Sequence, residues 1–423
     1  MKTEQLHKLF LECKKANTDT RKIEENDMFF ALKGENFNGN TYAIQAIEKG
    51  AKYAIIDEDI DTANSSQIIK VDNVLESLQE LASYHRSFLS IPVIALTGSN
   101  GKTTTKELIN TVLSQKYSTT ATVGNLNNHI GVPLTLLSMT SKTEIGIVEM
   151  GANHQKEIEF LCNIAKPDYG YITNFGKAHL EGFGGVEGVI KGKSEMYDYL
   201  ISNNKTVFVN ANDPIQIEKT KHAKTYSFGN EDSVVHTSLI SALPNVKVNY
   251  NNVTIESHLI GAYNYNNIAV AITVGTYFKV DDKAIKNAIA TYIPTNNRSQ
   301  IIKRDSNKII LDAYNANPTS MKAALLNLEK QSGYKIAIMG DMFELGKEAE
   351  YEHNYITDLA ISLNIDKLII VGENFFNTTP NSSNLSKYQL FEDFKASFDL
   401  SQIKDATILI KGSRGMALER TLE

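Results

Sequence analysis

The segment from Val93 to Thr104, which reads VIALTGSNGKTT, constrains the fold of this chain more than any other stretch. The apolar run Val93–Leu96 is typical of a buried strand, and Lys102–Gln115 contains no proline or glycine, so a helix can begin there. Between them, Gly98 and Gly101 allow backbone N–H groups to curl around an anion at the helix N-terminus. The segment therefore predicts that the chain binds a nucleoside triphosphate.

The loop is a short variant of the common phosphate-binding pattern. Leu96 occupies the position five residues before Gly101, where the usual pattern has glycine, so the motif here is GxxGKTT. Within it, Lys102 can reach the β- and γ-phosphates, and the Thr103 hydroxyl can bind Mg²⁺. The predicted nucleotide-binding residues of the loop are Gly98, Ser99, Asn100, Gly101, Lys102, Thr103 and Thr104.

Length and composition limit what kind of protein this is. At 423 residues the chain is too long for one ordinary core, which predicts two or three domains. No apolar stretch is long enough for a membrane span, and the first residues lack an apolar signal segment. Two distant cysteines make no disulfide framework, so we expect a cytoplasmic protein. The net charge of -6 disfavours a nucleic-acid partner.

Strand and helix signals divide the chain into three α/β domains. Residues 1–89 mix expected strands at Asp27–Leu32 and Tyr53–Asp57 with a helix at Leu75–Phe88. Residues 90–295 alternate strand and helix, which predicts a mostly parallel sheet covered by helices on both faces. Beyond the phosphate-binding segment, the strands expected there are Ile145–Met150, Tyr169–Asn174 and Thr206–Asn210, and the helices are Gln155–Ala165 and Val186–Ile201.

A turn-rich break at Pro294–Ser299 separates the last domain, residues 296–423. The alternation restarts beyond the break, which predicts a small Rossmann-like domain. Its expected strands are Lys308–Asp312, Lys335–Gly340, Lys367–Val371 and Thr407–Lys411. Gly340–Met342 and Lys411–Arg414 follow two of these strands, so we expect them at the carboxyl edge of the sheet, where open α/β sheets bind ligands.

Two side chains at the ends of expected strands in the central domain are candidates for catalysis. Glu149 ends Ile145–Met150, and a carboxylate beside Thr103 would suit a hard cation bound to nucleotide phosphates. His179, in TNFGKAHLEGFGG, could ligate a second metal ion as neutral imidazole or orient a transferring phosphoryl group. A solvated glutamate and a structural histidine are the alternatives.

Other polar residues leave more than one interpretation open. The amides of Asn125, Asn127 and Asn128 in GNLNNHIGVP either bind a substrate or phosphate, or simply form a turn. Arg298 in the break either closes onto a γ-phosphate or is a surface charge. Asp312, at a strand end, could hold ribose hydroxyls or a cation.

Several motifs, in order along nearly the whole chain, together resemble the Mur ligase family, the ATP-dependent amide-forming enzymes of peptidoglycan assembly. They are DTRKIEENDMFFALKGENFNGN, TGSNGKTTTKE, NLNNHIGVP, EMGANH, TNFGKAHLEGF, KGKSE, DAYNANPTSM, GDMFELG and KGSRGMALE. DAYNANPTSM and GDMFELG are similar to the branch of the family that adds D-alanyl-D-alanine. The resemblance implies an N-terminal domain that binds a UDP-sugar substrate, a central ATPase domain and a C-terminal ligase domain.

The resemblance also implies a reaction. The expected enzyme uses ATP and a pair of Mg²⁺ ions to join D-alanyl-D-alanine to UDP-N-acetylmuramoyl-tripeptide through an acyl phosphate. This is the last cytoplasmic step of peptidoglycan precursor synthesis, and the enzyme is expected to act as a monomer. The alternatives are a related ligase that adds a single amino acid (another Mur ligase or folylpolyglutamate synthase), a phosphotransferase, and a non-catalytic nucleotide-binding switch.

Residue by residue, the resemblance assigns roles to positions that match the family's motifs. Judged by its residue type alone, Lys193 would be a solvated lysine on a helix. The resemblance instead places it at the lysine that family members carbamylate with CO₂. The implied catalytic residues are Lys102, Glu149, His179, Lys193 and Arg298, and the implied metal ligands are Thr103, Glu149, His179 and Lys193. The implied nucleotide contacts are Asn264 and Asn267 for adenine, Arg298 for the γ-phosphate and Asp312 for the ribose. The implied substrate-binding residues are Thr20, Arg21, Lys33, Gly34, Asn125, Asn128, Asn315 and Asn317.

Three positions depart from the family's usual pattern. Tyr263 stands where many members have histidine, Asn38-Gly39-Asn40 replaces Asp-Gly-His, and Ser194 replaces a glycine. We therefore expect no histidine function at position 263, and we expect the backbone at Ser194 to remain helical.

Overall fold

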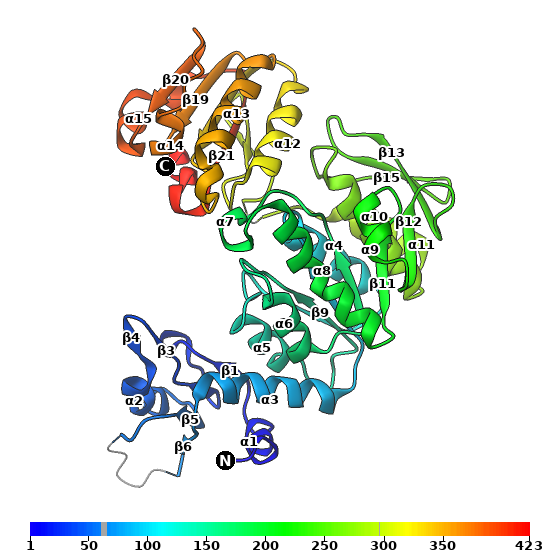
Figure 1. Ribbon diagram of the computed structural model, residues 1–423, viewed down its shortest axis with the longest axis vertical. Coiled ribbons are helices and arrows are strands. Elements are labelled where there is room, and N and C mark those ends of the chain that lie inside the picture. Colours follow the sequence, from blue (N-terminus) through cyan, green and yellow to red (C-terminus); the bar gives the residue numbers. More distant parts are fainter. Residues whose placement is uncertain (61–65, 296) are drawn as a thin grey trace.

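The computed structural model describes residues 1–60, 66–295 and 297–423 (Figure 1). Three α/β units follow one another along the chain and occupy the lower, middle and upper parts of the view. Asn296, which belongs to the turn-rich break and begins the expected last domain, lies outside the described residues. Within the described ranges, no helix combines the length and the apolar character that a bilayer span requires.

The N-terminal domain is built on a four-stranded parallel sheet in the order β1-β2-β5-β6. Its strands are β1 (Ala16–Asn17), β2 (Met28–Phe30), β5 (Tyr53–Ile56) and β6 (Ile68–Lys70), and its helices are α1 (Thr3–Phe10), α2 (Ala43–Glu48) and α3 (Val74–Leu89). A separate two-stranded ribbon consists of β3 (Lys33–Gly34) and β4 (Phe37–Asn38). The two strands and the helix that the sequence predicts here are confirmed as β2, β5 and α3.

Two buried histidines join the N-terminal domain to the central domain. His7 Nε2 on α1 lies 3.0 Å from His85 Nδ1 on α3, and His85 Nε2 lies 2.9 Å from the carbonyl oxygen of Met139 in the central domain. Because a carbonyl only accepts hydrogen bonds, the proton of His85 is on Nε2, and His7 Nε2–H donates to His85 Nδ1. The His85 ring is therefore neutral in this arrangement, and burial lowers the pKa of each imidazole.

The central domain contains a nine-stranded sheet in the order β15-β14-β13-β12-β11-β10-β7-β9-β8. Neighbours from β8 to β13 are parallel, whereas β13, β14 and β15 pair antiparallel. The strands are β7 (Val93–Thr97), β8 (Thr119–Ala121), β9 (Ile145–Glu149), β10 (Tyr169–Ile172), β11 (Thr206–Asn210), β12 (Lys224–Gly229), β13 (Val235–Ser241), β14 (Lys247–Tyr250) and β15 (Val253–Glu256). The helices are α4 (Lys102–Leu113), α5 (Gly131–Leu137), α6 (Glu157–Ala165), α7 (Leu180–Phe183), α8 (Val186–Ser202), α9 (Pro214–Lys219), α10 (Asn264–Tyr277) and α11 (Asp282–Thr291).

The strand, loop and helix of the phosphate-binding segment form as predicted. β7 lies between β9 and β10, and all five of its side chains are buried. α4 begins at Lys102, directly after the loop. By contrast, α6 begins at Glu157 and not at Gln155, because Lys156 has a φ of +73°, a left-handed conformation that a right-handed helix does not contain.

The antiparallel extension β13–β15 is absent from the sequence-based prediction. Tyr250 pairs with Val253 across Asn251 and Asn252, whose φ angles of +49° and +60° are those of a tight two-residue hairpin turn. Side chains along β14 alternate between partly exposed and buried, so no continuous apolar run marks the strand. The Asn-Asn pair is the local signal that would have predicted this hairpin.

The C-terminal domain contains a six-stranded sheet in the order β16-β17-β21-β18-β19-β20, parallel except for the β16–β17 pair. The strands are β16 (Gln300–Arg304), β17 (Asn307–Leu311), β18 (Tyr334–Gly340), β19 (Lys367–Val371), β20 (Leu385–Tyr388) and β21 (Ala406–Lys411). The helices are α12 (Pro318–Glu329), α13 (Ala349–Ser362), α14 (Glu373–Phe376) and α15 (Phe391–Ser397). The four strands predicted here are confirmed, and the two edge strands β16 and β20 are additional.

The buried His7–His85 pair predicts that the protein loses stability in mild acid. In the unfolded chain both imidazoles take up a proton near the ordinary pKa of about 6.5, whereas burial holds the pKa of each below this value in the folded state. The unfolded state therefore binds more protons between the two pKa values, so the free energy of unfolding falls as the pH drops through this range. Urea denaturation between about pH 7.5 and about pH 5.5 measures this loss.

The double variant His7→Asn/His85→Asn is expected to lose less stability than the wild type over the same pH range. His222→Asn is the matched control, because His222 is exposed and should leave the pH dependence unchanged. An unchanged pH dependence in the double variant would contradict the prediction.

Candidate active site

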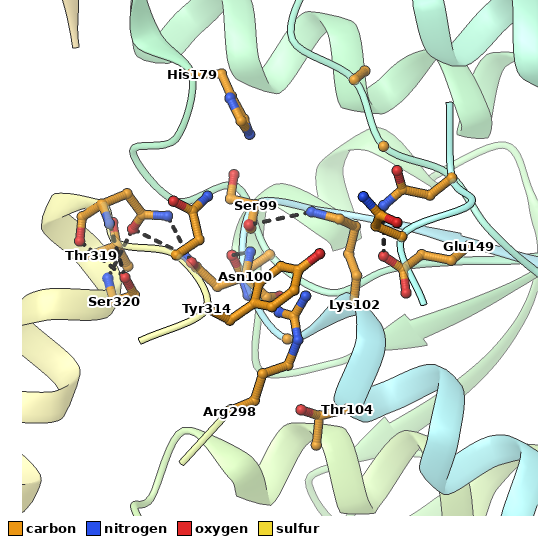
Figure 2. Close-up of a pocket in the computed structure, with 18 of the residues that line it drawn as sticks. Ser99, Asn100, Lys102, Thr104, Glu149, His179, Arg298, Tyr314, Thr319 and Ser320 are labelled. Carbon is orange, nitrogen blue, oxygen red and sulfur yellow. Dashed lines mark hydrogen bonds between the residues drawn. The ribbon is translucent and has the colours of Figure 1, made fainter. Parts of the chain in front are cut away.

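A cavity of about 590 Å³ lies between the central and C-terminal domains (Figure 2). We call it the interdomain cavity. Side chains from the phosphate loop, from the ends of β9 and β10, from α10 and from the start of the C-terminal domain line it. Of the predicted site residues, it brings together Ser99, Asn100, Gly101, Lys102, Thr104, Asn125, Asn128, Glu149, His179, Asn264, Asn267, Arg298, Asp312, Asn315 and Asn317.

The phosphate loop has the backbone conformation that its glycines predict. Gly98 and Gly101 have φ angles of +140° and +81°, and the Nζ of Lys102 donates a hydrogen bond to the Gly98 carbonyl at 2.7 Å. A Cβ at position 98 would lie 2.0 Å from the Oγ1 of Thr173, so only glycine allows the loop to pack this closely against the end of β10. Burial lowers the pKa of Lys102, which the nearby carboxylate of Glu149 opposes.

Glu149 is the buried carboxylate of the cavity, with only 1% of its surface exposed. Its Oε1 accepts hydrogen bonds from the Thr103 hydroxyl at 3.3 Å and from the Asn127 amide at 2.9 Å. Its Oε2 is buried and has no hydrogen-bond partner among the described residues. A buried carboxylate oxygen without a donor is destabilised unless a cation or proton approaches it, so the residues here fit a hard cation.

Within the described residues, no cluster of three or more histidine, cysteine, aspartate or glutamate side chains is arranged to hold a metal ion. Thr103 does not line the cavity surface itself, although its hydroxyl contacts Glu149 at the cavity wall. A cation at Glu149 would therefore need hydroxyl, phosphate or water oxygens to complete its coordination. Asn127, which sequence analysis left as a possible turn residue, is the amide that orients Glu149.

Lys193 is fully buried on α8, which overturns the interpretation of a solvated helix lysine. Its Nζ donates to the carbonyl of Ala152 at 3.1 Å and lies 4.9 Å from the centre of the Phe183 ring. No ion pair involves Lys193 in the part of the chain that the structure describes. Burial, and next the charge of Lys102, hold the pKa of Lys193 well below its ordinary value. Lys193 does not line the interdomain cavity itself, but its Nζ contacts Ala152, which does.

His179 precedes α7 in a left-handed conformation, with a φ of +52°. Its Nδ1 lies 2.5 Å from the Oε2 of Glu344, which belongs to the loop after β18 in the C-terminal domain. The imidazole lowers the pKa of the Glu344 carboxyl. Figure 2 shows the His179 ring projecting into the cavity from its upper wall, so a residue from each domain fixes this corner of the site.

Asn264 and Asn267 form a hydrogen-bonded wall at the start of α10. The Asn267 amide donates to Asn264 Oδ1 at 2.8 Å, and Asn267 Oδ1 accepts from the Thr105 hydroxyl at 3.0 Å. Tyr263 stands at the position where we expected no histidine function, and its hydroxyl shares a 2.7 Å hydrogen bond with the Ser299 hydroxyl. The tyrosine therefore ties the central domain to the start of the C-terminal domain.

Arg298 is held by an aromatic ring and not by an acid. Its guanidinium carbon lies 3.7 Å from the centre of the Tyr314 ring, and its Nε is buried without a hydrogen-bond partner among the described residues. Asp312 accepts a hydrogen bond from the backbone N–H of Ser299 at 2.9 Å and from Lys411 Nζ at 2.6 Å. Sequence analysis missed the role of Tyr314, and it placed Lys411 only at the sheet edge.

Asn100 and Asn317, two predicted site residues from different domains, form a hydrogen bond with each other. The Asn317 amide donates to Asn100 Oδ1 at 2.7 Å, and Asn317 Oδ1 accepts from the backbone N–H of Ser320 at 2.9 Å, which caps α12. Asn128 also has a capping role, because its Oδ1 accepts from the backbone N–H of Gly131 at 2.9 Å. Asn128 and Asn317 therefore both line the cavity and hold the backbone at the start of a helix.

The predicted substrate residues of the N-terminal domain do not reach the interdomain cavity. They are Thr20, Arg21, Lys33 and Gly34. Arg21 pairs with Asp19 at 2.9 Å, and Lys33 pairs with Asp57 at 3.1 Å. Asp341, at the edge expected to line the site, instead caps α14, because its carboxylate accepts hydrogen bonds from the backbone N–H groups of residues 374 and 375.

Three family models match the chain over most of its length. Residues 14–86 match the Mur ligase family catalytic domain, residues 96–275 the Mur ligase middle domain, and residues 297–414 the Mur ligase glutamate ligase domain. The UDP-N-acetylmuramoyl-tripeptide–D-alanyl-D-alanine ligase of Bacillus subtilis is 34% identical over 418 residues, which are 96% of this chain and 92% of the relative.

Two solved structures have the same arrangement of elements. MurF from Acinetobacter baumannii gives a TM-score of 0.88 at 31% identity and covers 99% of this chain and 97% of its own. MurF ligase from Thermotoga maritima, in complex with ADP, gives a TM-score of 0.82 at 26% identity, with coverage of 98% and 97%. The three-domain α/β fold predicted from the sequence is therefore confirmed.

The close approach of Gly98 to β10 predicts that Gly98→Ala disrupts the phosphate loop. The added Cβ would lie 2.0 Å from Thr173 Oγ1 and 2.9 Å from the Thr173 backbone nitrogen, at a φ that alanine rarely adopts. We expect a loss of more than about 1 kcal/mol in stability and of at least about tenfold in ADP affinity. A fluorescent ADP analogue supplies the binding signal, because the chain contains no tryptophan.

Gly184→Ala is the matched control for the steric clash. Gly184 also has a positive φ, of +76°, but a Cβ there meets nothing within 4 Å. We expect a similar backbone cost with unchanged nucleotide affinity. Equal losses of affinity in the two variants would contradict the importance of the Thr173 contact.

Proposed function

The chain belongs to the Mur ligase family, and we propose that it is the ATP-dependent ligase that joins D-alanyl-D-alanine to UDP-N-acetylmuramoyl-tripeptide. The observation that carries this proposal is the full-length similarity to relatives with this activity in their name, over 92% of the Bacillus subtilis ligase. A ligase that adds a single amino acid is not favoured, because the most similar curated relatives share the D-alanyl-D-alanine name.

A carboxylate and an amine do not condense in water, so the carboxylate must first be activated. In the proposed reaction, an oxygen of the tripeptide carboxylate attacks the γ-phosphorus of ATP, the bond to the bridging oxygen breaks, and ADP leaves. The amine of D-alanyl-D-alanine then attacks the acyl-phosphate carbonyl carbon, the bond to the phosphate oxygen breaks, and the amine loses a proton. Inorganic phosphate is therefore a product only when both substrates are present.

Lys102 and Arg298 are suited to stabilise the charge on the transferring phosphoryl group. Lys102 lies at the N-terminus of α4, where backbone N–H groups also favour an anion. The guanidinium of Arg298 is oriented by Tyr314, and its unpartnered Nε leaves donors free for phosphate oxygens. Preorganised cations of this kind stabilise phosphoryl-transfer transition states without reorganisation. The position of the cavity between two domains would reduce the access of water to the acyl phosphate.

Thr103 and Glu149 are the residues that would hold Mg²⁺. The unpartnered Glu149 Oε2 and the adjacent Thr103 hydroxyl are hard oxygen ligands of the kind this ion prefers. When bound, Mg²⁺ neutralises phosphate charge and fixes the orientation of the nucleotide. We assign His179 and Lys193 to a second ion, in line with the family resemblance.

Lys193 is proposed to carry a carbamate. Burial and the charge of Lys102 lower the pKa of Lys193, which favours the neutral amine, and a neutral amine can add to the carbon of CO₂ and release a proton. The product replaces a buried cation with an anionic oxygen ligand, next to the Ala152 carbonyl at the cavity wall.

The remaining assignments follow the family's motif positions. Asn264 and Asn267 would contact the adenine, and Asp312 the ribose. We propose that Thr20, Arg21, Lys33 and Gly34 hold the uridine end of the substrate, and that Asn125, Asn128, Asn315 and Asn317 contact its peptide or D-alanyl-D-alanine. Domain boundaries at 89/90 and 295/296, a monomeric state and a cytoplasmic location belong to the same proposal.

The proposed reaction predicts that phosphate release depends on both substrates. Wild-type enzyme with ATP, Mg²⁺ and UDP-N-acetylmuramoyl-tripeptide should release phosphate when D-alanyl-D-alanine is added, and much less with single amino acids. Lys102→Ala should lower turnover by at least about a thousandfold, because it removes the cation at the transferring phosphoryl group. Lys116→Ala, an exposed lysine beyond α4, is the control and should retain activity. Stable phosphorylated product without released phosphate would instead indicate a phosphotransferase.

The proposed carbamate predicts chemical rescue of a lysine variant. Lys193→Ala should lose nearly all turnover, and added short carboxylates such as formate or acetate should restore part of it by supplying the missing oxygen ligand. Lys191→Ala, an exposed lysine on the same helix, is the matched control. Full activity of Lys193→Ala would refute the assignment.

A further inference from the structure

Arg298 stands between two residues that have a left-handed backbone. Asn297 has a φ of +54° and Ser299 a φ of +52°, although neither is glycine. Asparagine tolerates this conformation, whereas serine adopts it rarely, so at Ser299 it persists because neighbouring groups hold it. The direction in which the Arg298 side chain leaves the main chain therefore depends on the contacts of Ser299.

Two hydrogen bonds hold Ser299, one at its main chain and one at its side chain. Its backbone N–H donates to Asp312 Oδ1 at 2.9 Å, and its hydroxyl shares a 2.7 Å hydrogen bond with the Tyr263 hydroxyl. Asp312 is fixed in turn by Lys411, whose Nζ donates to Oδ2 at 2.6 Å. Ser299 is only 7% exposed, so loss of the partner of its hydroxyl would leave a polar group poorly solvated.

The Tyr263 ring packs closely against the main chain of Gly261. Gly261 has a φ of +81°, and a Cβ there would lie 2.3 Å from Cε1 of the ring. The next residue after Tyr263 is Asn264, where α10 begins, so the ring is attached to the start of a helix. Burial raises the pKa of Tyr263, and the charge of Asp312 raises it further, so the hydroxyl keeps its proton. The packing therefore presents a neutral hydroxyl to Ser299 in a fixed place.

The guanidinium of Arg298 is held from another side by an aromatic ring. Its carbon lies 3.7 Å from the centre of the Tyr314 ring, and Figure 2 shows the side chain extending to that ring. A cation–π contact keeps the guanidinium over the ring but does not fix how the main chain presents it. The conformation of the turn at Ser299 therefore supplies the remaining constraint.

Arg298 and Lys102 direct their charges at the same part of the interdomain cavity. Burial lowers the pKa of Lys102, and the charge of Arg298 lowers it further, against the opposing effect of Glu149. Two cations that oppose each other in this way suit an anion with several charges, such as the phosphates of a nucleotide. The position of Arg298 therefore matters for the phosphoryl group that is transferred.

We propose that Tyr263 is a positioning residue that acts through Ser299, because its hydroxyl fixes the turn that presents Arg298 to the γ-phosphoryl group. The proposal rests on the ligase function above, in which Arg298 stabilises that group. Tyr263 stands where many members of the family have histidine. A phenol oxygen lies further from the main chain than an imidazole nitrogen, so the replacement gives this chain a hydroxyl within reach of Ser299.

Double-mutant cycles test whether Tyr263 acts through Ser299 and Arg298. Tyr263→Phe removes only the hydroxyl and should lower kcat by about 5–30-fold, and Ser299→Ala should cause a similar loss. The double variant should lose no more than about twofold beyond the larger single loss. In an Arg298→Ala background, Tyr263→Phe should change kcat by less than about twofold. Additive losses in either cycle would overturn the proposal.

Nucleotide binding gives a readout that needs no turnover. ADP has no γ-phosphate, so Tyr263→Phe should leave its affinity within about twofold of the wild type, as measured by titration calorimetry. The affinity for a non-hydrolysable ATP analogue should fall by at least about threefold. A merely structural role would weaken both ligands alike. Equal losses for the two nucleotides, or no loss for either, would overturn the proposal.

Tyr265→Phe is the matched control in both experiments. It removes a tyrosine hydroxyl from the same helix, and that hydroxyl bonds to Thr237 outside the cavity. The kinetics and both affinities should remain unchanged. If Tyr263→Phe does not fold, Ser299→Ala tests the same hydrogen bond from its other end. If the wild type releases no phosphate that depends on D-alanyl-D-alanine, the proposed function fails, while the comparison of ADP with the ATP analogue still decides the role of Tyr263.

Discussion

The close packing of the phosphate loop against β10 is the constraint on which the rest of the site depends. Gly98 can approach Thr173 only because it has no side chain, since a Cβ would lie 2.0 Å from the threonine oxygen. This close packing places the phosphate loop beside the segment that follows β10, where the Ser99 hydroxyl donates a hydrogen bond to the Gly176 carbonyl. That segment carries His179 and contacts the C-terminal domain, so the packing at Gly98 places the phosphate loop next to the segment that meets the other domain.

Burial decides the chemistry of the individual groups in this cavity. Burial lowers the pKa of Lys193 behind the cavity wall, whereas Glu149 keeps one oxygen without a donor among the described residues, in a site that fits a cation. Arg298 rests on the face of Tyr314 and keeps a donor free. The cavity therefore collects groups that are incompletely satisfied by the protein, which is the arrangement expected where phosphates and cations bind.

Sequence reasoning succeeded where the signal is local. The strand, glycine and helix pattern of 93–113 predicts its own conformation, and apolar runs mark the buried strands of all three domains. It missed the hairpin of β14 and β15, whose strands alternate between solvent and core, and the edge strands β16 and β20. For the site, it found Lys193 only through a family resemblance, because a lysine on a helix carries no local sign of burial.

By itself, the sequence determined the phosphate loop, the order of strands and helices, and the residue types available to the site. These depend on backbone propensity and on periodicity, which act over a few neighbouring residues. Only the tertiary structure decided that Asn127 orients Glu149, that Tyr314 supports Arg298, and that Glu344 of one domain meets His179 of another. Those pairs are 22, 16 and 165 positions apart, and they meet because of sheet order and domain docking, which no local pattern encodes.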